Sequence, residues 1–281
     1  MECSARSAGV LPAQSGGAVT ETAGIILAGG LSQRFAAAGN VPKALAPLCG
    51  LPLILHVAAA LVEGGAGRIT VLTGAHHESL CAGLGLRPAA LARAMFNFGD
   101  RKIPFTLRST PSDWGTAGRL TALTPEEWGE GAALLAYTDI LTDAPLAALR
   151  EARANARADL AVLAVNPTLP WGELQLEDER VLRFIEKPAT QDRWINGGVF
   201  ALDRGILAHV DDPMIMLERA PALAVVSAGA MVALRHQGFW HSVETQKDLL
   251  LAEQRVAAEK TSRLWRRAQL MRGQAKVLLA E

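Results

Sequence analysis

The stretch GIILAGGLSQRFAAAGNVPKALAPL, residues 24–48, decides how the rest of the chain is interpreted. Its first five residues form an apolar run that predicts a short buried β-strand, and Gly29 and Gly30 follow at once. Two cations, Arg34 and Lys43, then lie around a glycine-containing loop. Glycines let a backbone approach a ligand closely, and successive N–H groups in such a turn can bind phosphate oxygens. The stretch therefore predicts a strand followed either by a phosphate-binding loop or by an ordinary tight turn.

The composition of the 281 residues is that of a globular protein, because 50% are hydrophobic and only 20% are charged. The 28 lysines and arginines balance 28 aspartates and glutamates, which excludes the broad positive field of a sequence-independent nucleic-acid binder. The cysteines, Cys3, Cys49 and Cys81, are odd in number and lack metal-ligand spacing. A disulfide framework or a zinc site is therefore not expected.

The chain is expected to consist of a flexible N-terminal tail, residues 1–22, and a single domain, residues 23–281, that ends in a helix. The tail is small and polar and has no apolar run of the length that a signal peptide needs. No later segment approaches about 18 uncharged apolar residues, the length that a membrane helix needs. We therefore expect a cytoplasmic protein with no membrane partner.

From residue 24 onward, short apolar runs alternate with amphipathic stretches, which is typical of βαβ units and a largely parallel sheet. A charged turn between two short runs predicts a hairpin over 171–188, and Asp143 is placed to cap a helix. The absence of Gly and Pro predicts one long helix over about 245–271. The other expected strands are 24–28, 68–74, 105–109, 131–139, 159–165 and 195–203, a further strand begins the stretch 229–245 before a loop, and the other expected helices are 51–65 and 142–158.

Ligands of open α/β sheets bind beyond the carboxyl ends of the strands, so the residues that follow the expected strands form the candidate site. The pair Gly29 and Gly30 has neither the GK[ST] of a Walker loop nor the spacing of GxGxxG, and by itself it favours a simple turn. For Asp139 the alternative is a helix cap, which is less favoured than a ligand role, and Glu186 with Lys187 could be a surface ion pair of little energetic value. For Asn196, which precedes two glycines, a role in a turn is as well supported as contact with a ligand.

The order of six motifs resembles that of the sugar-1-phosphate nucleotidyltransferases. LAGGLSQRF with Pro42 and Lys43 is similar to the family's LAGGxGTR followed by PK, and SDWGTAGRL, AYTDILTD, FIEKP, WINGGVF and HQGFWHSVET come later in the family's order. FNFGDRKI, WINGGVFAL and LRHQGFW are most similar to the glucose-1-phosphate cytidylyltransferase branch, which couples CTP to glucose 1-phosphate and releases pyrophosphate. The resemblance covers residues 24–254. It implies an α/β, Rossmann-like, three-layer αβα fold with a mixed, mostly parallel sheet.

The resemblance implies a nucleotide site, a sugar-phosphate site and a metal site. The nucleotide would lie over Leu27, Ala28, Gly29 and Gly30, with Gly115 and Thr116 near the base. The expected catalytic residues are Arg34 and Lys43 on the triphosphate, Asp139, and Lys187 on the sugar phosphate. Gly172, Glu186 and Asn196 would complete the sugar pocket with Lys187, and Asp139 and Glu244 would hold Mg²⁺.

This chemistry suits the residues. A phosphate monoester has a second pKa near 6, so at neutral pH it is already a charged nucleophile and needs no general base. The task that remains is to bring two anions together in line and to neutralise their charge.

Three positions depart from the family pattern: Ser32 and Thr138 replace glycines, and Glu244 replaces an aspartate. They leave two alternatives open: transfer with another nucleotide and a hexose or heptose 1-phosphate, or a catalytically weak homologue that binds a sugar nucleotide. The final helix could pack on its own chain or pair with another subunit, so a homo-oligomer is a further expectation.

Overall fold

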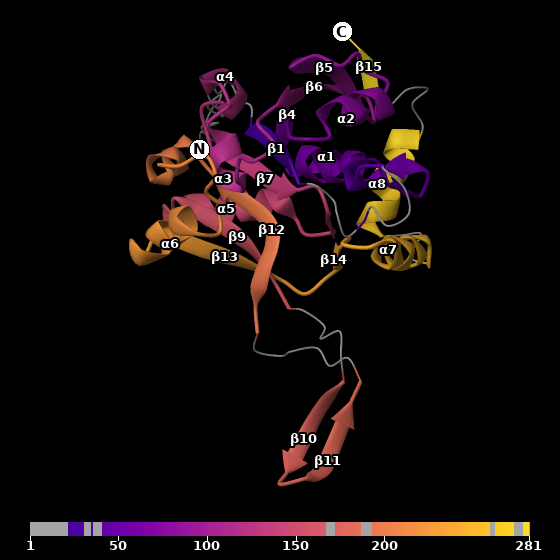
Figure 1. The fold of residues 1–281 in the computed structure, drawn as a ribbon, viewed down its shortest axis with the longest axis vertical. Coiled ribbons are helices and arrows are strands. Elements are labelled where there is room, and N and C mark those ends of the chain that lie inside the picture. The colour runs from indigo at the N-terminus through magenta and orange to yellow at the C-terminus, as the bar shows by residue number, and fades with distance from the viewer. Residues whose placement is uncertain are drawn as a thin grey trace, which may run out of the picture.

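The computed structural model describes residues 22–30, 35, 41–166, 172–186, 193–258, 262–272 and 278–280 (Figure 1). The expected tail, residues 1–22, lies outside the described residues except for its last position. In this part of the chain, no helix is both long enough and apolar enough to cross a membrane.

A nine-stranded sheet forms the centre of the molecule, in the order β13-β9-β12-β7-β1-β4-β6-β5-β15. Seven strands run in one direction, whereas β5 and β12 run in the other. This confirms the mixed, mostly parallel sheet. The bounds of the strands are β1 Thr22–Ala28, β4 Ala66–Thr73, β5 Leu91–Phe98, β6 Arg101–Ser109, β7 Ala133–Tyr137, β9 Leu160–Val165, β12 Ile195–Leu202, β13 Met231–His236 and β15 Leu278–Ala280.

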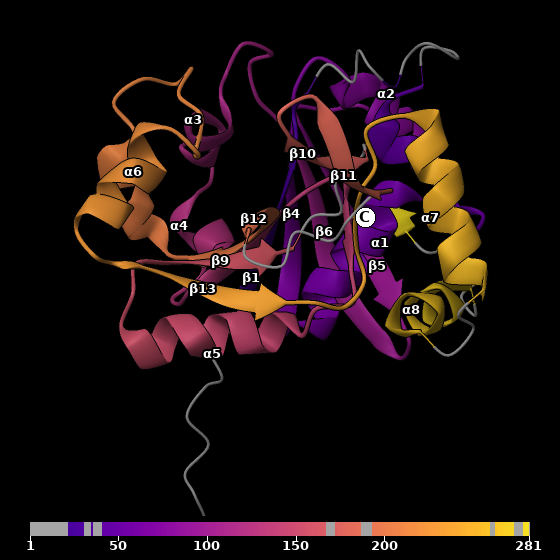
Figure 2. The same ribbon diagram turned by 90° about the horizontal axis from the view of Figure 1, so that it is seen from below.

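Helices cover both faces of the sheet, which gives three layers (Figure 2). Alternating residues of β1 separate the two cores, because Ile26 packs toward α1, α5 and α8 whereas Ile25 and Leu27 pack toward α3, α4 and α6. The helices are α1 Leu53–Glu63, α2 His77–Gly83, α3 Thr116–Leu120, α4 Pro125–Trp128, α5 Leu146–Ala156, α6 Ala220–Ser227, α7 Gln246–Ala258 and α8 Arg263–Arg272, with the 3-10 helices η2 Lys43–Leu45 and η3 Arg204–His209.

Three two-stranded sheets complete the fold: β2 Pro47–Leu48 with β3 Leu51–Pro52, β8 Ile140–Thr142 with β14 Trp240–Ser242, and β10 Glu173–Glu177 with β11 Arg180–Ile185. The last pair is the predicted hairpin, and it stands away from the body on the side where β7 ends and β12 begins (Figure 1). Its register places five apolar side chains on one face, and each is 48–66% exposed: Leu174, Leu176, Val181, Leu182 and Phe184.

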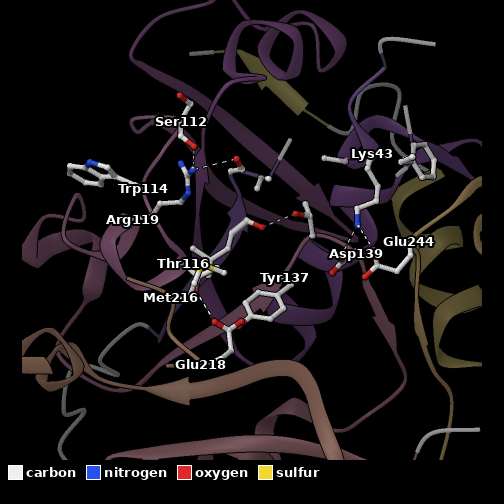
Figure 3. Close-up of a pocket in the computed structure, with 17 residues that line it drawn as sticks. Lys43, Ser112, Trp114, Thr116, Arg119, Tyr137, Asp139, Met216, Glu218 and Glu244 are labelled. Carbon is white, nitrogen blue, oxygen red and sulfur yellow. Dashed lines mark hydrogen bonds and ion pairs between the residues drawn. The ribbon is translucent and has the colours of Figure 1, made fainter. Parts of the chain in front are cut away.

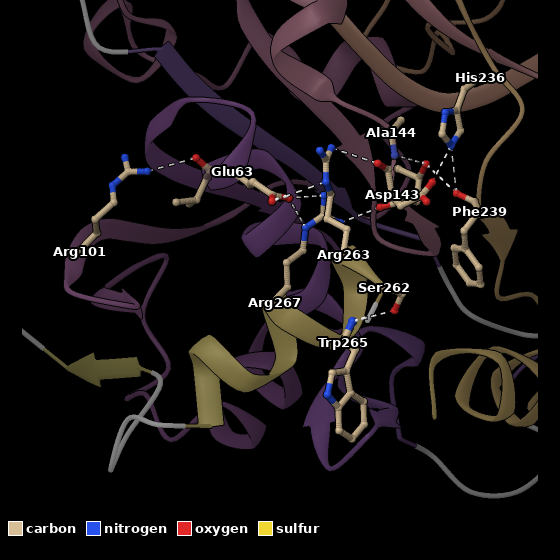
Figure 4. A network of polar contacts seen from close by, with 12 residues as sticks. Glu63, Arg101, Asp143, Ala144, His236, Phe239, Ser262, Arg263, Trp265 and Arg267 are labelled. Carbon is tan, nitrogen blue, oxygen red and sulfur yellow. Dashed lines mark hydrogen bonds and ion pairs between the residues drawn. The ribbon is translucent and has the colours of Figure 1, made fainter. Parts of the chain in front are cut away.

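The C-terminal segment forms two helices, so the prediction of one helix over about 245–271 was wrong. Ser262 begins a new helix, because its Oγ accepts a hydrogen bond from the amide of Trp265 at 3.2 Å. The second helix is anchored by Arg267, which donates to Glu63 Oε2 and to the Thr142 carbonyl, each at 2.6 Å (Figure 4). An ion pair between the buried Arg267 and the exposed Glu63 therefore fastens α8 to α1.

Asp143 was also predicted wrongly as a helix cap. Pro145 is the N-cap residue of α5, and no side chain caps that helix end. The Asp143 carboxylate instead accepts a hydrogen bond from His236 Nε2 at 2.8 Å (Figure 4). Burial by itself would raise the pKa of Asp143, but the bond to His236 and its charge outweigh burial and lower it.

Candidate active site

A cavity of about 640 Å³ opens at the carboxyl ends of β1 and β7 (Figure 3). This is where an open α/β sheet places its ligands. Its volume lies within the range of pockets that bind small molecules such as nucleotides. The described residues that line it are Leu27, Ala28, Gly29, Gly30, Phe35, Lys43, Ala44, Ser112, Trp114, Thr116, Arg119, Tyr137, Thr138, Asp139, Met216, Glu218 and Glu244.

Strand pairing brings together two carboxylates that are 105 positions apart in the chain. Asp139 directly precedes β8, and Glu244 comes two residues after the end of β14. These strands pair antiparallel, with Ser242 opposite Ile140, and the amide of Val243 donates to the Asp139 carbonyl at 2.9 Å. Both side chains therefore reach the same corner of the cavity.

Lys43 lies between the two carboxylates. Its Nζ is 2.7 Å from Asp139 Oδ2 and 3.8 Å from Glu244 Oε2. The lysine side chain is 14% exposed, and the carboxylates are 20% and 37% exposed. The ammonium thus occupies a position at which the two carboxylates can bind a cation.

A second polar group lies across the cavity, around Glu218 (Figure 3). Tyr137 donates its hydroxyl to Glu218 Oε1, and Thr116 donates to Glu218 Oε2 at 3.0 Å. Burial, reinforced by the Glu218 charge, raises the pKa of Tyr137, so the phenol stays protonated and acts as a donor. Thr116 also accepts a bond from the amide of Leu217 at 2.7 Å, which fixes the loop that carries Glu218.

Thr138 joins the ends of two neighbouring strands. Its hydroxyl donates to the Leu27 carbonyl at 2.7 Å, so the side chain that replaces a glycine makes a contact between β7 and β1. This bond turns the hydroxyl toward the Leu27 backbone.

The predicted site residues separate into four groups, of which the described sugar-pocket residues form the last. Leu27 to Gly30, Lys43, Thr116, Asp139 and Glu244 line the cavity. Gly115 lies beside it and donates its amide to the Pro213 carbonyl at 2.9 Å. Arg34 and Lys187, and the variant position Ser32, lie outside the described residues.

Of the expected sugar pocket, the three described residues, Gly172, Glu186 and Asn196, are not among the described residues that line the cavity. Gly172 and Glu186 lie together on the hairpin, because a Cβ added to Gly172 would come within 3.2 Å of Glu186 Oε2. Asn196 accepts a bond from the amide of Gly198 at 2.8 Å, and Gly198 has a φ of +71°. Both residues lie within β12, so this bond stabilises the irregularity in the strand after Asn196, and contact of Asn196 with a sugar stays a prediction.

The residues predicted from the sequence did not include Arg119, Tyr137 or Glu218, which also line the cavity. Arg119 and Tyr137 stand inside quoted motifs, SDWGTAGRL and AYTDILTD, so nearness to Thr116 and Asp139 could have suggested them. Glu218 lies in an unremarked loop, and no local pattern indicates it.

Among the described lining residues, three carboxylates outnumber two cations: Asp139, Glu218 and Glu244 face Lys43 and Arg119. A polyphosphate would therefore meet net negative charge here unless it arrived with a cation.

The chain is similar to several characterised proteins. It is 23% identical over 240 residues to glucose-1-phosphate cytidylyltransferase of Salmonella typhi, covering 82% of this chain and 93% of that protein. It is 28% identical over 239 residues to a Bacillus subtilis (strain 168) protein described as "Probable glucose-1-phosphate cytidylyltransferase", covering 80% of this chain and 92% of that one.

A solved structure from Bacillus anthracis, a candidate glucose-1-phosphate thymidylyltransferase in complex with sucrose, has the same fold. It superposes with a TM-score of 0.61 at 19% sequence identity, over 83% of this chain and 94% of that one. The model of the MobA-like NTP transferase domain matches residues 24–270. The chain therefore belongs to the MobA-like NTP transferase domain family.

Proposed function

We propose that the protein transfers a nucleotidyl group from a nucleoside triphosphate to a sugar 1-phosphate and releases pyrophosphate. CTP and glucose 1-phosphate are the first pair to test, because both cytidylyltransferase relatives match along more than nine-tenths of their length. The observation that carries the proposal is the meeting of Lys43, Asp139 and Glu244 at the carboxyl ends of β1 and β7, beside Leu27 to Gly30.

The donor set at this corner fits Mg²⁺. Asp139 and Glu244 are hard oxygen donors that converge on one point, and Mg²⁺ is commonly held by one or two carboxylates with substrate phosphates and water. No cluster of three or more His, Cys, Asp or Glu among the described residues suggests a protein-only metal cage. When bound, the ion would neutralise phosphate charge and polarise the phosphorus that is attacked.

The protein's own residues have two tasks in this mechanism. The backbone from Leu27 to Gly30 would receive the nucleotide, and a Cβ added to Gly30 would have no protein atom within 4 Å, so a ligand can approach there closely. Lys43 would exchange its contacts with the carboxylates for contacts with phosphate oxygens. The sugar phosphate is the nucleophile and needs no proton acceptor, so positioning and charge are sufficient.

A panel of the common nucleoside triphosphates with hexose and heptose 1-phosphates, assayed for pyrophosphate release with Mg²⁺, tests the proposal. We expect one pair to dominate, and Asp139→Asn to lower its turnover roughly a hundredfold or more, because a metal contact contributes several kcal/mol to the transition state. Arg204→Lys, at an exposed position on η3 outside the cavity, is a control for handling and folding.

Two outcomes would count against the proposal. If no pair releases pyrophosphate although a nucleotide binds, the protein is a sugar-nucleotide-binding homologue. If the Glu244→Asp variant then releases pyrophosphate, the wild type is inactive because the glutamate side chain is longer than that of aspartate. Turnover in Asp139→Asn at the wild-type rate would remove the assigned carboxylate from the chemistry.

A further inference from the structure

Among the described residues, the buried Arg119 guanidinium donates hydrogen bonds to neutral oxygen atoms only, and the Asp113 carboxylate acts on it without forming an ion pair. The Arg119 side chain extends from α3 and is 4% exposed. None of the ion pairs between described residues includes it. Buried arginines are usually paired with a carboxylate, so an arginine placed in this way requires a structural explanation.

The guanidinium joins the loops that follow three neighbouring strands. It donates to the carbonyl of Thr73, the last residue of β4, at 2.8 Å and to that of Gly29 after β1 at 3.3 Å. It also donates to the hydroxyl of Thr110 and, at 3.1 Å, to the carbonyl of Ser112, both after β6. Only arginine has a rigid planar fork that can satisfy four acceptors spread over three loops.

Two glycines beside the Arg119 guanidinium leave the space that it occupies. A Cβ on Gly29 would lie 2.1 Å from Arg119 Cζ, and a Cβ on Gly74 would lie 3.0 Å from Nη1. Gly29 is not among the residues with positive φ, so its backbone does not demand glycine. Space for the guanidinium is therefore the reason for the first glycine of the pair.

We propose that Arg119 is the positioning residue of the nucleotide site, because it fixes the Gly29–Gly30 turn against the Thr110–Ser112 loop. This inference rests on the proposed function, since the turn it holds is the one that would receive the triphosphate. Arg119 lines the cavity wall across from Lys43 (Figure 3), and its fixed charge also favours an anionic ligand.

Amide hydrogen exchange without any ligand tests the positioning directly. Arg119→Lys keeps the charge but loses the fork, so exchange in a peptide covering residues 27–30 should rise about tenfold, as expected when one or two hydrogen bonds are lost. A peptide from α5, Leu146–Ala156, should not change. Arg108→Lys is the matched control, because Arg108 pairs with Glu127 outside the cavity. Unchanged exchange at 27–30 would overturn the inference, even if the wild type is an active enzyme.

The KM values for the two substrates distinguish a positioning role from a general structural role, which would affect both substrates. In Arg119→Lys, the KM for the nucleotide should rise about tenfold, while the KM for the sugar 1-phosphate stays within about twofold. A wild type that releases no pyrophosphate would refute the proposed function, and the exchange experiment would still decide the role of Arg119. Equal changes in the KM values for the nucleotide and for the sugar 1-phosphate would contradict the assigned role of Arg119.

A double-mutant cycle separates steric coupling from independent effects. Gly29→Ala should weaken binding of the Mg²⁺–CTP complex about tenfold, since the new methyl group displaces the guanidinium. In an Arg119→Met background, Gly29→Ala should weaken this binding less than threefold. If the fold-changes of the two single substitutions instead multiply in the double variant, the two residues are not coupled and the assignment is contradicted. Should Arg119 variants fail to fold, Thr110→Val removes one acceptor, and it should still raise exchange at 27–30; no increase would overturn the inference.

Discussion

One ammonium group, that of Lys43, contacts both carboxylates that are proposed to hold a metal ion. A divalent cation can therefore bind there only if the ammonium moves away, and nucleotide phosphates offer the lysine an alternative partner. We predict that Lys43→Met raises the affinity for Mn²⁺ at least about tenfold without nucleotide, because two partly buried carboxylates then lack a nearby cation. Titration of free Mn²⁺ by electron paramagnetic resonance measures the dissociation constant.

The matched control for this experiment is Lys102→Met, because Lys102 is an exposed lysine of β6 outside the cavity. Its affinity for Mn²⁺ should equal that of the wild type. Weaker or unchanged Mn²⁺ binding in Lys43→Met would mean that the lysine does not compete with the metal.

Individual residues could be predicted where a local pattern marks them. Lys43 follows Pro42 after a glycine-containing loop and Asp139 ends an apolar run, so strand ends and charge marked both as candidates, and the order of the motifs then implied their roles. Glu218 carries no such mark, because its position depends on two hydrogen bonds with Thr116 and Tyr137 from distant elements. Side-chain partners of this kind are fixed by tertiary structure alone.

At the scale of elements, α3 packs closely against the 213–218 loop, because Gly118 has no side chain between its backbone and that of Pro213. A Cβ on Gly118 would lie 1.7 Å from the Pro213 carbonyl oxygen, and that loop carries Glu218 into the cavity. We predict that Gly118→Ala lowers the free energy of unfolding by about 2 kcal/mol or more, as overpacking does. Urea unfolding followed by tryptophan fluorescence measures the change.

Gly131→Ala is the control for this substitution, because a Cβ at Gly131 would have no atom within 4 Å. Its stability should stay within about 0.5 kcal/mol of the wild type. A Gly118→Ala protein as stable as Gly131→Ala would show that the loop can move away from α3 at no cost.

Elements with strong periodicity or turn chemistry were predictable, and those defined by a single capping residue were not. The apolar spacing of α1 and the charged turn of the β10-β11 hairpin identify both from sequence. The break between α7 and α8 depends on Ser262, whose hydroxyl begins a helix inside a stretch without Gly or Pro.

At the scale of the whole molecule, the sheet order places residues that sequence distance separates. Alternating strands and helices predict a mostly parallel sheet, but they do not predict that β12 inserts between β7 and β9. Nor do they predict the β8-β14 pairing that brings Glu244 to Asp139. Non-local pairing is selected by the total burial of the core, which no short stretch encodes.

The stability of the whole fold should depend on pH through His56 of α1. This side chain is 3% exposed, and its Nε2 donates to the Leu48 carbonyl at 2.9 Å. Burial lowers the pKa of His56 from 6.5 to about 4, and the charges of Arg267 and Arg272 add to the effect. The folded protein therefore keeps the imidazole neutral at pH values where the unfolded chain binds a proton.

The sign of the effect follows from this difference. The contribution of His56 is fully present well above pH 6.5 and is lost as the pH falls toward 4, which amounts to about 1–2 kcal/mol between pH 6.5 and pH 5. His56→Gln keeps a donor for the Leu48 carbonyl but cannot titrate. Between pH 6.5 and pH 5, the free energy of unfolding of this variant should therefore fall less than that of the wild type, by the amount that His56 contributes. Urea unfolding at both pH values measures the difference, with the exposed His209→Gln as the matched control. Parallel losses of stability in the wild type and His56→Gln would mean that this imidazole is protonated in the fold or reaches water.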